Sequence, residues 1–572
     1  MPRRDPVLWI RVRAMTENAP PLQSYEEAQA LLTAPGAPFE LIEEEVLGEK
    51  MAVFKARASS LRELLGRSES HGDATYLIFD DGRQVTYAEN LRVVASVAAA
   101  LRDNYGVGKG DRVAILAANC PEWIVTYWAT VSLGAIAVGM NGWWAGDEME
   151  YGIEVSEPKV LIADERRLAR FQGDGPGVPT VLIERDFEKL WNYDLDAKLP
   201  EVDVAEDDPA VLLFTSGTTG RPKAAMLSHR SLIAFVMQSF FIGARRAMCE
   251  PSGGKSGALL AAFPLFHVSG LMGSATTGLA GGTTSVWPTG RFDAKKIIEL
   301  SKQHGITSWT GAGTQIFRLL DALDESDFDA SDLTNVGIGG SATTPELVRR
   351  TEQRLPQLKG TFGTGYGATE TGAIVSYAGN SMLAENPSCV GPPLPGVEIK
   401  IVDDEGQVVP DGEDGHICVR SQLVMLGYWK NDAANRETFL PGRWLDTGDF
   451  GNLRDGRLHM ASRKRDLIIR GGENIYPIEI ENRLEAHPDV AEVAVVGVDH
   501  VELGQEVKAI VVARDGNSPA PEALREFVGE KLAYFKVPTY VEVRSEALPR
   551  NATGKVMKHV LTGDGENTFV EE

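Results

Sequence analysis

Cysteine is scarce in this chain. Cys120, Cys249, Cys389 and Cys418 are its 4 cysteines among 572 residues, and they lie far apart without a C-x-x-C pair. This spacing excludes a disulfide framework and a cysteine-based zinc site, and it is typical of a reducing compartment. We therefore predict a cytoplasmic protein in which each cysteine is a small buried hydrophobe.

Long hydrophobic runs are also missing. No segment reaches the roughly 18 uninterrupted apolar residues of a membrane span. The most apolar region, residues 258–280, contains Pro264 and His267, so it predicts a buried strand and helix beside a pocket. Near the N-terminus, Arg11 and Arg13 interrupt the only apolar run, and we expect no export signal.

Basic residues are in deficit. The chain has 57 Lys and Arg against 81 Asp and Glu, a formal net charge of -24. Such a balance argues against a general nucleic-acid or anionic-membrane surface, since phosphate binding needs clustered cations. Any polyanionic ligand must therefore meet a local basic patch. At this length, two or more domains are expected.

One stretch, from Leu212 to Lys223, joins a buried-strand pattern to a turn rich in hydroxyls and glycines. Glycine lets the backbone approach a polyanion, hydroxyls and N–H groups donate to phosphate oxygens, and the lysine adds charge. Arg221 and Pro222 separate Gly220 from Lys223, and this spacing disfavours a P-loop NTPase. A flexible surface turn would have a similar composition. The predicted phosphate-binding residues are Thr215, Ser216, Gly217, Thr218, Thr219, Gly220 and Lys223.

Residues 216–223, S-G-T-T-G-R-P-K, resemble the signature of the adenylate-forming superfamily, which holds acyl-CoA synthetases, aryl-CoA ligases, luciferases and peptide-synthetase adenylation domains. Further motifs of that family follow in order. They are Y-G-A-T-E-T-G at 366–372, W-L-D-T-G-D at 444–449, R-K-R-D at 463–466 and L-P-R-N-A-T-G-K at 548–555. The resemblance spans residues 60–558.

Hydrophobic patterning independently predicts the fold class. Residues 87–102 have helical spacing, 112–116 are a short β-rich run, and 121–133 are again helical. This alternation predicts an α/β fold with parallel sheets covered by helices. Residues 477–532 show a compact α+β pattern of a helix, two strands and a helix.

The resemblance implies a division of the chain. We expect an N-terminal extension over 1–55, an adenylation domain over 56–464 with a small β-barrel subdomain near 390–460, and a mobile C-terminal lid over 465–572. The hinge falls at Arg465, where most relatives carry Asp or Lys.

Making an acyl-adenylate requires a carboxylate to attack the α-phosphorus of ATP, so positioning and positive charge should dominate catalysis. The resemblance implies that Lys555, carried by the lid, bridges the carboxylate and the α-phosphate and is swung away for thioester formation. Glu370, with Thr215, would hold Mg²⁺, and Thr369 would donate to the α-phosphate. His267 would lie near the acyl carboxylate, although a hydrogen-bonded core histidine would look the same.

The other implied contacts involve the nucleotide and CoA. Asp449 would accept the ribose hydroxyls and Arg463 would add a second contact, while Gly472 would let a loop lie against the pantetheine of CoA. Adenine would be contacted by Gly340, Ser341, Ala342, Tyr366 and Gly367. Arg470 and Lys558 would add local basicity for CoA.

These implications predict an ATP-dependent, AMP-forming carboxylate–CoA ligase that uses ATP, Mg²⁺ and CoA. The acyl pocket would be lined by 267–272, 309–313, 339–342 and 363–366, and the small residues at 311–313 favour a medium- or long-chain fatty acid or another bulky acid. Three alternatives stay open: an acyl- or aryl-AMP ligase serving a carrier protein or other acceptor, a luciferase-like oxygenase, and a non-catalytic nucleotide-binding homologue. A homodimer is one assembly we expect, without nucleic acid and without a transmembrane segment.

Overall fold

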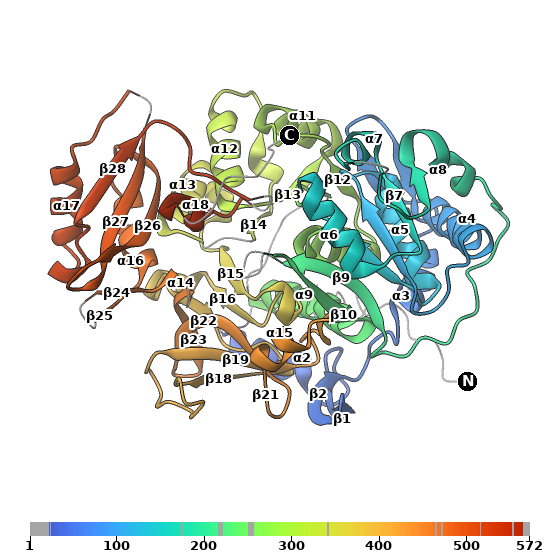
Figure 1. The fold of residues 1–572 in the computed structure, drawn as a ribbon, viewed down its shortest axis with the longest axis horizontal. Helices are drawn as coiled ribbons and strands as arrows, with labels where there is room; N and C mark the ends of the chain where they lie inside the picture. The colour runs from blue at the N-terminus through green and yellow to red at the C-terminus, as the bar shows by residue number, and fades with distance from the viewer. Residues whose placement is uncertain are drawn as a thin grey trace.

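The computed structural model describes residues 22–563 except residues 23, 173–174, 216–220, 250–256, 340–342, 464–465, 471–472, 515 and 552–553; the side chains of residues 462, 463 and 474 are also left undescribed. Figure 1 shows a large body of three layered sheets, with a smaller C-terminal domain at one end. This arrangement confirms the predicted α/β class with a separate C-terminal domain.

The first large sheet has the strand order β20-β10-β9-β6-β5-β7-β8. The strands from β9 to β8 pair in parallel, and β10 returns antiparallel to β9. Its inner strands are continuous buried apolar runs, which is the pattern of a parallel sheet covered on both faces. The strands are β5 (Arg112–Leu116), β6 (Ile136–Gly139), β7 (Val160–Ala163), β8 (Thr180–Leu182), β9 (Pro209–Thr215), β10 (Lys223–Ser228) and β20 (Gly427–Tyr428), with helices α4 (Tyr87–Tyr105), α5 (Pro121–Ser132), α6 (Gly146–Ser156), α7 (Glu165–Leu168) and α8 (Ile183–Trp191).

The second large sheet has the order β14-β13-β11-β12-β3-β4, parallel except for the hairpin of β3 and β4. Its core is a separate cluster centred on the fully buried Trp309. The strands are β3 (Thr75–Phe79), β4 (Gln84–Thr86), β11 (Ala258–Leu260), β12 (Ser285–Trp287), β13 (Ile306–Gly311) and β14 (Asn335–Ile338), with helices α9 (His229–Cys249), α10 (Thr277–Gly281), α11 (Ala294–His304), α12 (Gly313–Asp324) and α13 (Pro345–Arg354) and the π-helix η2 (Ser269–Thr276).

An antiparallel sheet occupies the region of the predicted barrel, with the order β17-β23-β22-β19-β18 and β21 paired to β22. A hairpin of β15 and β16 leads into it. The elements are β15 (Gly363–Tyr366), β16 (Ser376–Gly379), α14 (Asn380–Glu385), β17 (Cys389–Gly391), β18 (Val397–Val402), β19 (Gly415–Ser421), α15 (Asp432–Thr438), β21 (Phe439–Leu440), β22 (Trp444–Arg454) and β23 (Arg457–Arg463).

The C-terminal domain has its own core. A five-stranded sheet packs against α16 and α17, and Ile480, Val495 and Leu524 are buried between them. The elements are β24 (Ile468–Arg470), β25 (Glu473–Ile475), α16 (Pro477–Glu485), β26 (Val490–His500), β27 (Gly504–Ala513), α17 (Pro521–Gly529), β28 (Tyr540–Arg544) and α18 (Lys558–Thr562). The predicted helix–strand–strand–helix pattern is therefore present.

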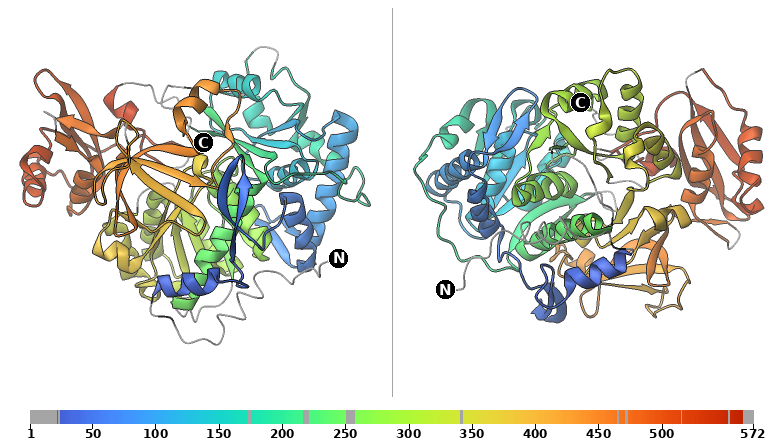
Figure 2. Two further views of the ribbon diagram at one scale, coloured as in Figure 1. Left: turned by 90° about the horizontal axis from the view of Figure 1, so that it is seen from below. Right: turned by 180° about the vertical axis from the view of Figure 1, so that it is seen from behind.

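The described part of the N-terminal segment packs on α9. It comprises α2 (Tyr25–Thr33), the hairpin β1 (Leu41–Val46) and β2 (Glu49–Phe54), and α3 (Leu61–Arg67) follows it. Figure 2 shows α2 lying along α9. The Phe39 ring meets Phe241 of α9 edge to face at 5.5 Å, and the Leu22 N–H donates to the Met248 carbonyl. This segment thus contributes to the core of the large body.

Helix α9 is the one described helix that is long and apolar enough to cross a membrane, and 56% of its most apolar segment is buried inside the protein. A mostly buried core helix meets the same criterion, so α9 is weak evidence for a membrane span. None of the four cysteines, all of which are described, forms a disulfide bond. Cys389 and Cys418 are buried as predicted, whereas Cys120 and Cys249 are half-buried because they lie at the ends of helices.

Candidate active site

The predicted phosphate loop joins two antiparallel strands at the edge of the first sheet. Strand β9 ends at Thr215 and β10 begins at Lys223, and these two residues are register partners. The Thr215 hydroxyl donates to the Lys223 carbonyl at 3.5 Å. The hairpin therefore holds the hydroxyl and the lysine at the same end of the sheet. Residues Ser216 to Gly220, which complete the loop, lie outside the described residues.

Lys223 points toward Tyr428, a residue that the sequence motifs did not predict. Its Nζ lies 5.1 Å from the centroid of the Tyr428 ring, and the Tyr428 hydroxyl donates to Glu370 Oε1 at 3.0 Å. Burial and then the Glu370 carboxylate raise the pKa of Tyr428 far above its ordinary value, so the phenol stays protonated and orients Glu370. Strand β20 reaches this position by pairing with β10, a long-range contact with no local sequence signal.

Glu370 offers a hard carboxylate oxygen next to the phosphate loop, which suits Mg²⁺. The Met425 N–H fixes the Glu370 backbone by donating to its carbonyl at 2.9 Å. The described residues contain no cluster of three or more His, Cys, Asp or Glu side chains able to hold a metal. A magnesium ion here would thus take most of its ligands from phosphates and water, with Thr215 close by on β9.

A buried tyrosine–aspartate pair lies beside this cluster. The Tyr366 hydroxyl, at the end of β15, donates to Asp449 Oδ2 on β22 at 2.8 Å, and each residue is 9% exposed. Asp449 pairs in register with Arg463 of β23, so the two predicted ribose contacts lie opposite each other. Tyr366, the predicted adenine contact, is therefore hydrogen-bonded directly to Asp449, the predicted ribose acceptor. Thr369, which is also 9% exposed, lies on the turn that follows β15.

Gly367 has a structural reason beyond ligand contact. A Cβ at this position would come 2.2 Å from the Ala373 carbonyl oxygen, so residue 367 can carry no side chain in the turn that leads to Thr369 and Glu370. A glycine here is required by the backbone approach itself.

The C-terminal domain brings Lys555 within electrostatic range of His267. Burial and then the Lys555 ammonium lower the pKa of His267 to about 4, so the imidazole is neutral at pH 7. His267 lies in the loop before η2, as its N–H donates to the Pro264 carbonyl. Lys555 and His267 are far apart in the sequence, and both are predicted to act on the acyl carboxylate. The fold thus brings them together.

A short hairpin holds Lys555. Its N–H donates to Asn551 Oδ1 at 3.0 Å, and the Arg550 guanidinium binds the Gly554 carbonyl at 2.7 Å and Glu492 of β26 at 3.0 Å. A Cβ on Gly554, whose φ is +78°, would stand 3.0 Å from Ala312 Cβ. The lysine hairpin therefore docks closely on the turn between β13 and α12.

Two predictions about neighbouring residues are corrected. Trp309 is fully buried and its Nε1 donates to Ser301 at 2.9 Å, so it belongs to the core of the second sheet and does not line an acyl pocket. Arg470 is bound to Glu506, and Lys558 to Glu481 at 2.8 Å. In this lid orientation both cations are used within the C-terminal domain.

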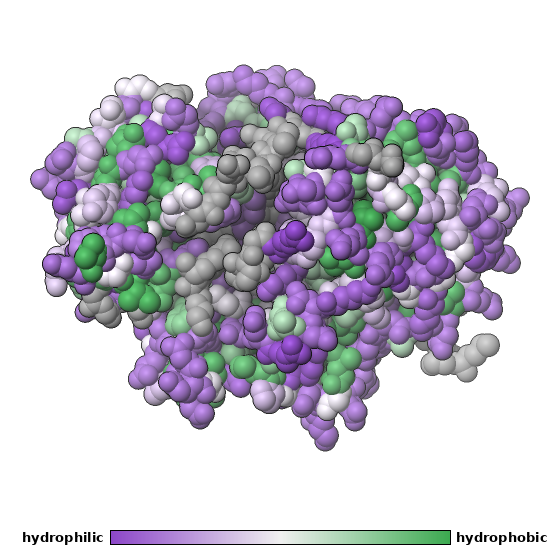
Figure 3. Space-filling model, in the orientation of Figure 1, coloured by the Kyte–Doolittle hydropathy of each residue, from purple (hydrophilic) through white to green (hydrophobic). Residues whose placement is uncertain are grey.

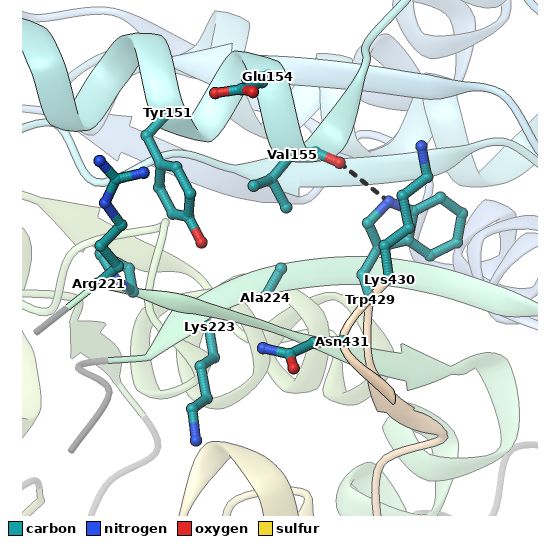
Figure 4. Close-up of a pocket in the computed structure, with 10 residues that line it drawn as sticks. Tyr151, Glu154, Val155, Arg221, Lys223, Ala224, Trp429, Lys430 and Asn431 are labelled. Carbon is teal, nitrogen blue, oxygen red and sulfur yellow. Dashed lines mark hydrogen bonds between the residues drawn. The ribbon is translucent and has the colours of Figure 1, made fainter. Parts of the chain in front are cut away.

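A cavity of about 240 Å³ opens beside the start of β10, lined among others by Tyr151, Arg221, Lys223 and Lys430. Figure 4 shows Lys223 pointing away from Arg221 and Tyr151. The Arg221 guanidinium lies 5.0 Å from the Tyr151 ring centroid. The Lys223 ammonium is thus directed toward Tyr428 and Glu370, while the Arg221 guanidinium lines the outer cavity.

Several predicted contacts lie outside the described residues: Gly340, Ser341, Ala342, Arg465 and Gly472, together with the side chain of Arg463. Their roles stay predictions. In Figure 3 the visible face is mostly hydrophilic and is hollowed between the C-terminal domain and the large body.

The hairpin from β9 to β10, the Tyr366–Asp449 pair and Lys555 on the C-terminal domain are the features expected of an adenylate-forming enzyme. The sequence profile of the AMP-binding enzyme family matches residues 66–429, and that of the AMP-binding enzyme C-terminal domain matches residues 479–555. The chain belongs to this family, and the predicted membership of the AMP-forming acyl-CoA synthetases is confirmed.

Relatives of this chain include ligases that use different acceptors. It is 31% identical to the fatty acid–[acyl-carrier-protein] ligase ScoC of Streptomyces coeruleorubidus, covering 86% of this chain and 93% of that one. It is 33% identical to the 2-succinylbenzoate–CoA ligase of Bacillus licheniformis, covering 86% and 98%.

Among solved structures, ATP-bound MatB from Rhodopseudomonas palustris is similar with a TM-score of 0.77 at 28% identity, covering 88% of this chain and 98% of that one. Apo MatB gives 0.68 over the same shares. The structure is thus more similar to the ATP-bound than to the apo form of the same relative.

Proposed function

We propose that this chain activates a medium- or long-chain fatty acid, or a similarly bulky carboxylic acid, by adenylation with ATP and then transfers the acyl group to CoA. The observation that carries the proposal is the docking of the Lys555 hairpin on the large body, where a Cβ on Gly554 would stand 3.0 Å from Ala312 Cβ and the Lys555 charge reaches His267. A lysine delivered from a separate domain is the feature that the two-step reaction requires.

Each charged residue has a task in adenylation. Lys223 and the Thr215 hydroxyl bind the terminal phosphates, and Asp449, held by Tyr366, accepts the ribose hydroxyls. The Lys555 ammonium offsets the repulsion between the carboxylate and the α-phosphate and the charge that develops as pyrophosphate leaves. Neutral His267 lies beside Lys555 and positions the acyl carboxylate without competing for its charge.

Mg²⁺ would be held by Glu370, together with Thr215, and would neutralise phosphate charge. Tyr428 keeps the Glu370 carboxylate aimed at this position. Gly472 is proposed to let its loop lie against the pantetheine of CoA, and Arg463 is proposed to contact the ribose.

Small residues at 311–313 are the basis for a bulky acid, but packing explains part of this pattern. A Cβ on Gly311 would stand 3.0 Å from Gln315 Oε1, which caps α12 by accepting from the Ala312 N–H at 2.9 Å. The contact with Gln315 therefore accounts for Gly311 without an acyl ligand. A cytoplasmic location and a homodimer stay predictions.

The test measures pyrophosphate release with ATP and Mg²⁺ over short, medium, long-chain, aromatic and steroidal acids, with and without CoA. Release that CoA strongly accelerates, with a fatty acyl-CoA product, would support the proposal. The name of ScoC makes carrier-protein transfer the second candidate, and slow release with retained acyl-AMP would favour it. No release with any acid would refute both.

A further inference from the structure

The C-terminal domain meets the large body at a second place, between the end of α16 and the start of α13. A cavity of about 540 Å³ separates them, lined by Glu346, Arg349 and Arg350 of α13 and by Glu485, His487 and Arg514 of the C-terminal domain. This interface exists only while the domain holds its present orientation, which is also the one that places Lys555 beside His267.

Glu485 is the uncompensated group of this interface. Its Oε2 is inaccessible to solvent and has no hydrogen-bond partner, and Thr344, the N-cap of α13, lies near enough to lower the pKa of its carboxyl. The Thr344 hydroxyl caps α13 by accepting from the Leu347 N–H at 3.3 Å. Burying a carboxylate oxygen without a partner is costly, and protonation relieves the cost.

The neighbouring charges are engaged elsewhere. Glu346 binds Arg349 at 2.8 Å and faces Arg514, and Arg350 binds Asp321. Within the C-terminal domain, Arg550 binds Glu492 at 3.0 Å and Glu481 binds Lys558 at 2.8 Å. His487 Nδ1 accepts from the Asp489 N–H at 3.2 Å. Among the described residues, no cation forms a salt bridge with Glu485.

The resulting environment favours the neutral acid. Burial, with further contributions from Glu481 and Glu346, raises the pKa of Glu485 to about 7, although Thr344 and Arg550 act in the opposite direction. Thr344 caps α13 and Glu346 lies in its first turn, so part of this environment is lost if the C-terminal domain turns away and exposes Glu485 to water.

We propose that Glu485 is a positioning residue that takes up a proton from solvent when the C-terminal domain docks for adenylation and returns it when the domain rotates away. The proposal rests on the proposed two-step function for its purpose, but the docking itself is measurable without catalysis. Low pH then favours the adenylation orientation, and higher pH favours release of the domain and the thioester step.

The direction of the pH effect follows from the linkage between proton binding and docking. The docked state binds the proton more tightly than the released state, in which the glutamate returns to its ordinary value of 4.5. The contribution of this proton to docking is therefore complete below about 4.5 and is lost as pH rises through about 7. Between about pH 8 and about pH 6 the docking equilibrium should shift about tenfold toward the docked state.

The experiment places spin labels at Gln353→Cys on α13 and Glu522→Cys on α17, both exposed, and measures the distance distribution across this pH range without substrates. We expect the fraction with the short, docked distance to grow as pH falls. The neutral isostere Glu485→Gln should give the same docked fraction at every pH, equal to that of the wild type at low pH.

Two variants serve as controls. Glu479→Gln changes the same chemical group on the same helix, but Glu479 binds Lys536 within the domain, so the pH dependence should persist. His487→Gln should also preserve it. A distance distribution independent of pH in the wild type, or a pH dependence that survives in Glu485→Gln or disappears in His487→Gln, would overturn the proposal.

Activity supplies a separate readout. In the wild type the ratio of adenylation to thioester rates should fall as pH rises, and in Glu485→Gln it should fall less steeply, because only the ionisation of the CoA thiol then contributes. If no acid is adenylated, the proposed function fails, yet the spin-label result still decides the role of Glu485.

Discussion

At the scale of single residues, the site is organised by side chains that orient one another. Tyr366 holds Asp449, Tyr428 holds Glu370, and Lys555 lies within electrostatic range of a neutral His267. Each pair fixes one charged group in a direction that a substrate can use. Pre-positioned charge of this kind needs no reorganisation during the reaction.

The Tyr366–Asp449 pair gives the first prediction. Tyr366→Phe keeps the ring for adenine but removes the hydroxyl that orients Asp449, and a lost hydrogen bond to a carboxylate should raise the KM for ATP about tenfold. Steady-state kinetics with varied ATP measure this. Tyr193→Phe is the matched control, because Tyr193 donates to Asp103 at 3.4 Å on the exposed surface. An unchanged KM in Tyr366→Phe would remove Tyr366 from the ribose site.

Sequence motifs predicted residues whose neighbours in the chain carry a pattern, such as Tyr366, Glu370 and Asp449. They could not predict Tyr428, because its contact with Glu370 depends on β20 pairing with β10. They also assigned Trp309 to a pocket, whereas its alternating position on β13 points into the core. Long-range strand pairing and side-chain direction are decided by the whole fold.

At the scale of elements, buried polar contacts join helices that are distant in sequence. His229, the first residue of α9, is fully buried and its Nδ1 accepts from the Leu61 N–H of α3 at 3.1 Å. Its Nε2 has no hydrogen-bond partner. Burial lowers the pKa of His229 to about 4, so this junction requires the neutral imidazole.

The His229 junction predicts acid sensitivity. The unfolded chain binds the proton near pH 6.5 and the folded chain only near 4, so stability is present above about 6.5 and is lost as pH falls toward 4, by up to about 3 kcal/mol. In urea unfolding followed by circular dichroism, His229→Gln should lose less stability over this range than the wild type. The exposed His559→Gln should behave as the wild type, and an unchanged pH slope in His229→Gln would contradict the account.

The Lys555 hairpin predicts a selective defect. Gly554→Ala should slow adenylation about tenfold, because it combines an unfavourable positive φ with a close approach to Ala312. Thioester formation from supplied acyl-adenylate should be spared. Gly563→Ala is the control, since its φ is +84° and no atom lies within 4 Å of its Cβ. Equal defects in the two variants, or in the two half-reactions, would argue against docking at Ala312.

Regular elements were the part best predicted from the sequence. The run at 112–116 is β5, the helical spacing at 87–102 corresponds to α4, and the first helix of the pattern over 477–532 is α16, since short apolar runs and amphipathic helices carry local signals. The π-helix η2 was not predicted, because its backbone depends on the packing of the loop after His267. The arrangement of residues 25–54 on α9 was likewise missed.

At the scale of the molecule, two bodies with separate cores meet at the site. In the proposed function the large body supplies the nucleotide contacts and the C-terminal domain supplies Lys555, so adenylation would depend on their relative orientation. The greater similarity to ATP-bound than to apo MatB agrees with an orientation suited to adenylation. Glu485, at the far side of the same interface, ties this orientation to protonation.

The central claim is that Lys555 serves adenylation from a docked lid and is not needed for thioester formation. The most direct measurement compares wild type and Lys555→Ala in the two half-reactions: pyrophosphate release from ATP and acid, and acyl-CoA formation from supplied acyl-adenylate. Lys531→Ala, an exposed lysine of the same domain, is the control. We predict that Lys555→Ala lowers the first rate on the order of 100-fold or more and leaves the second nearly unchanged. Unchanged pyrophosphate release, or equal loss in both half-reactions, would contradict the account.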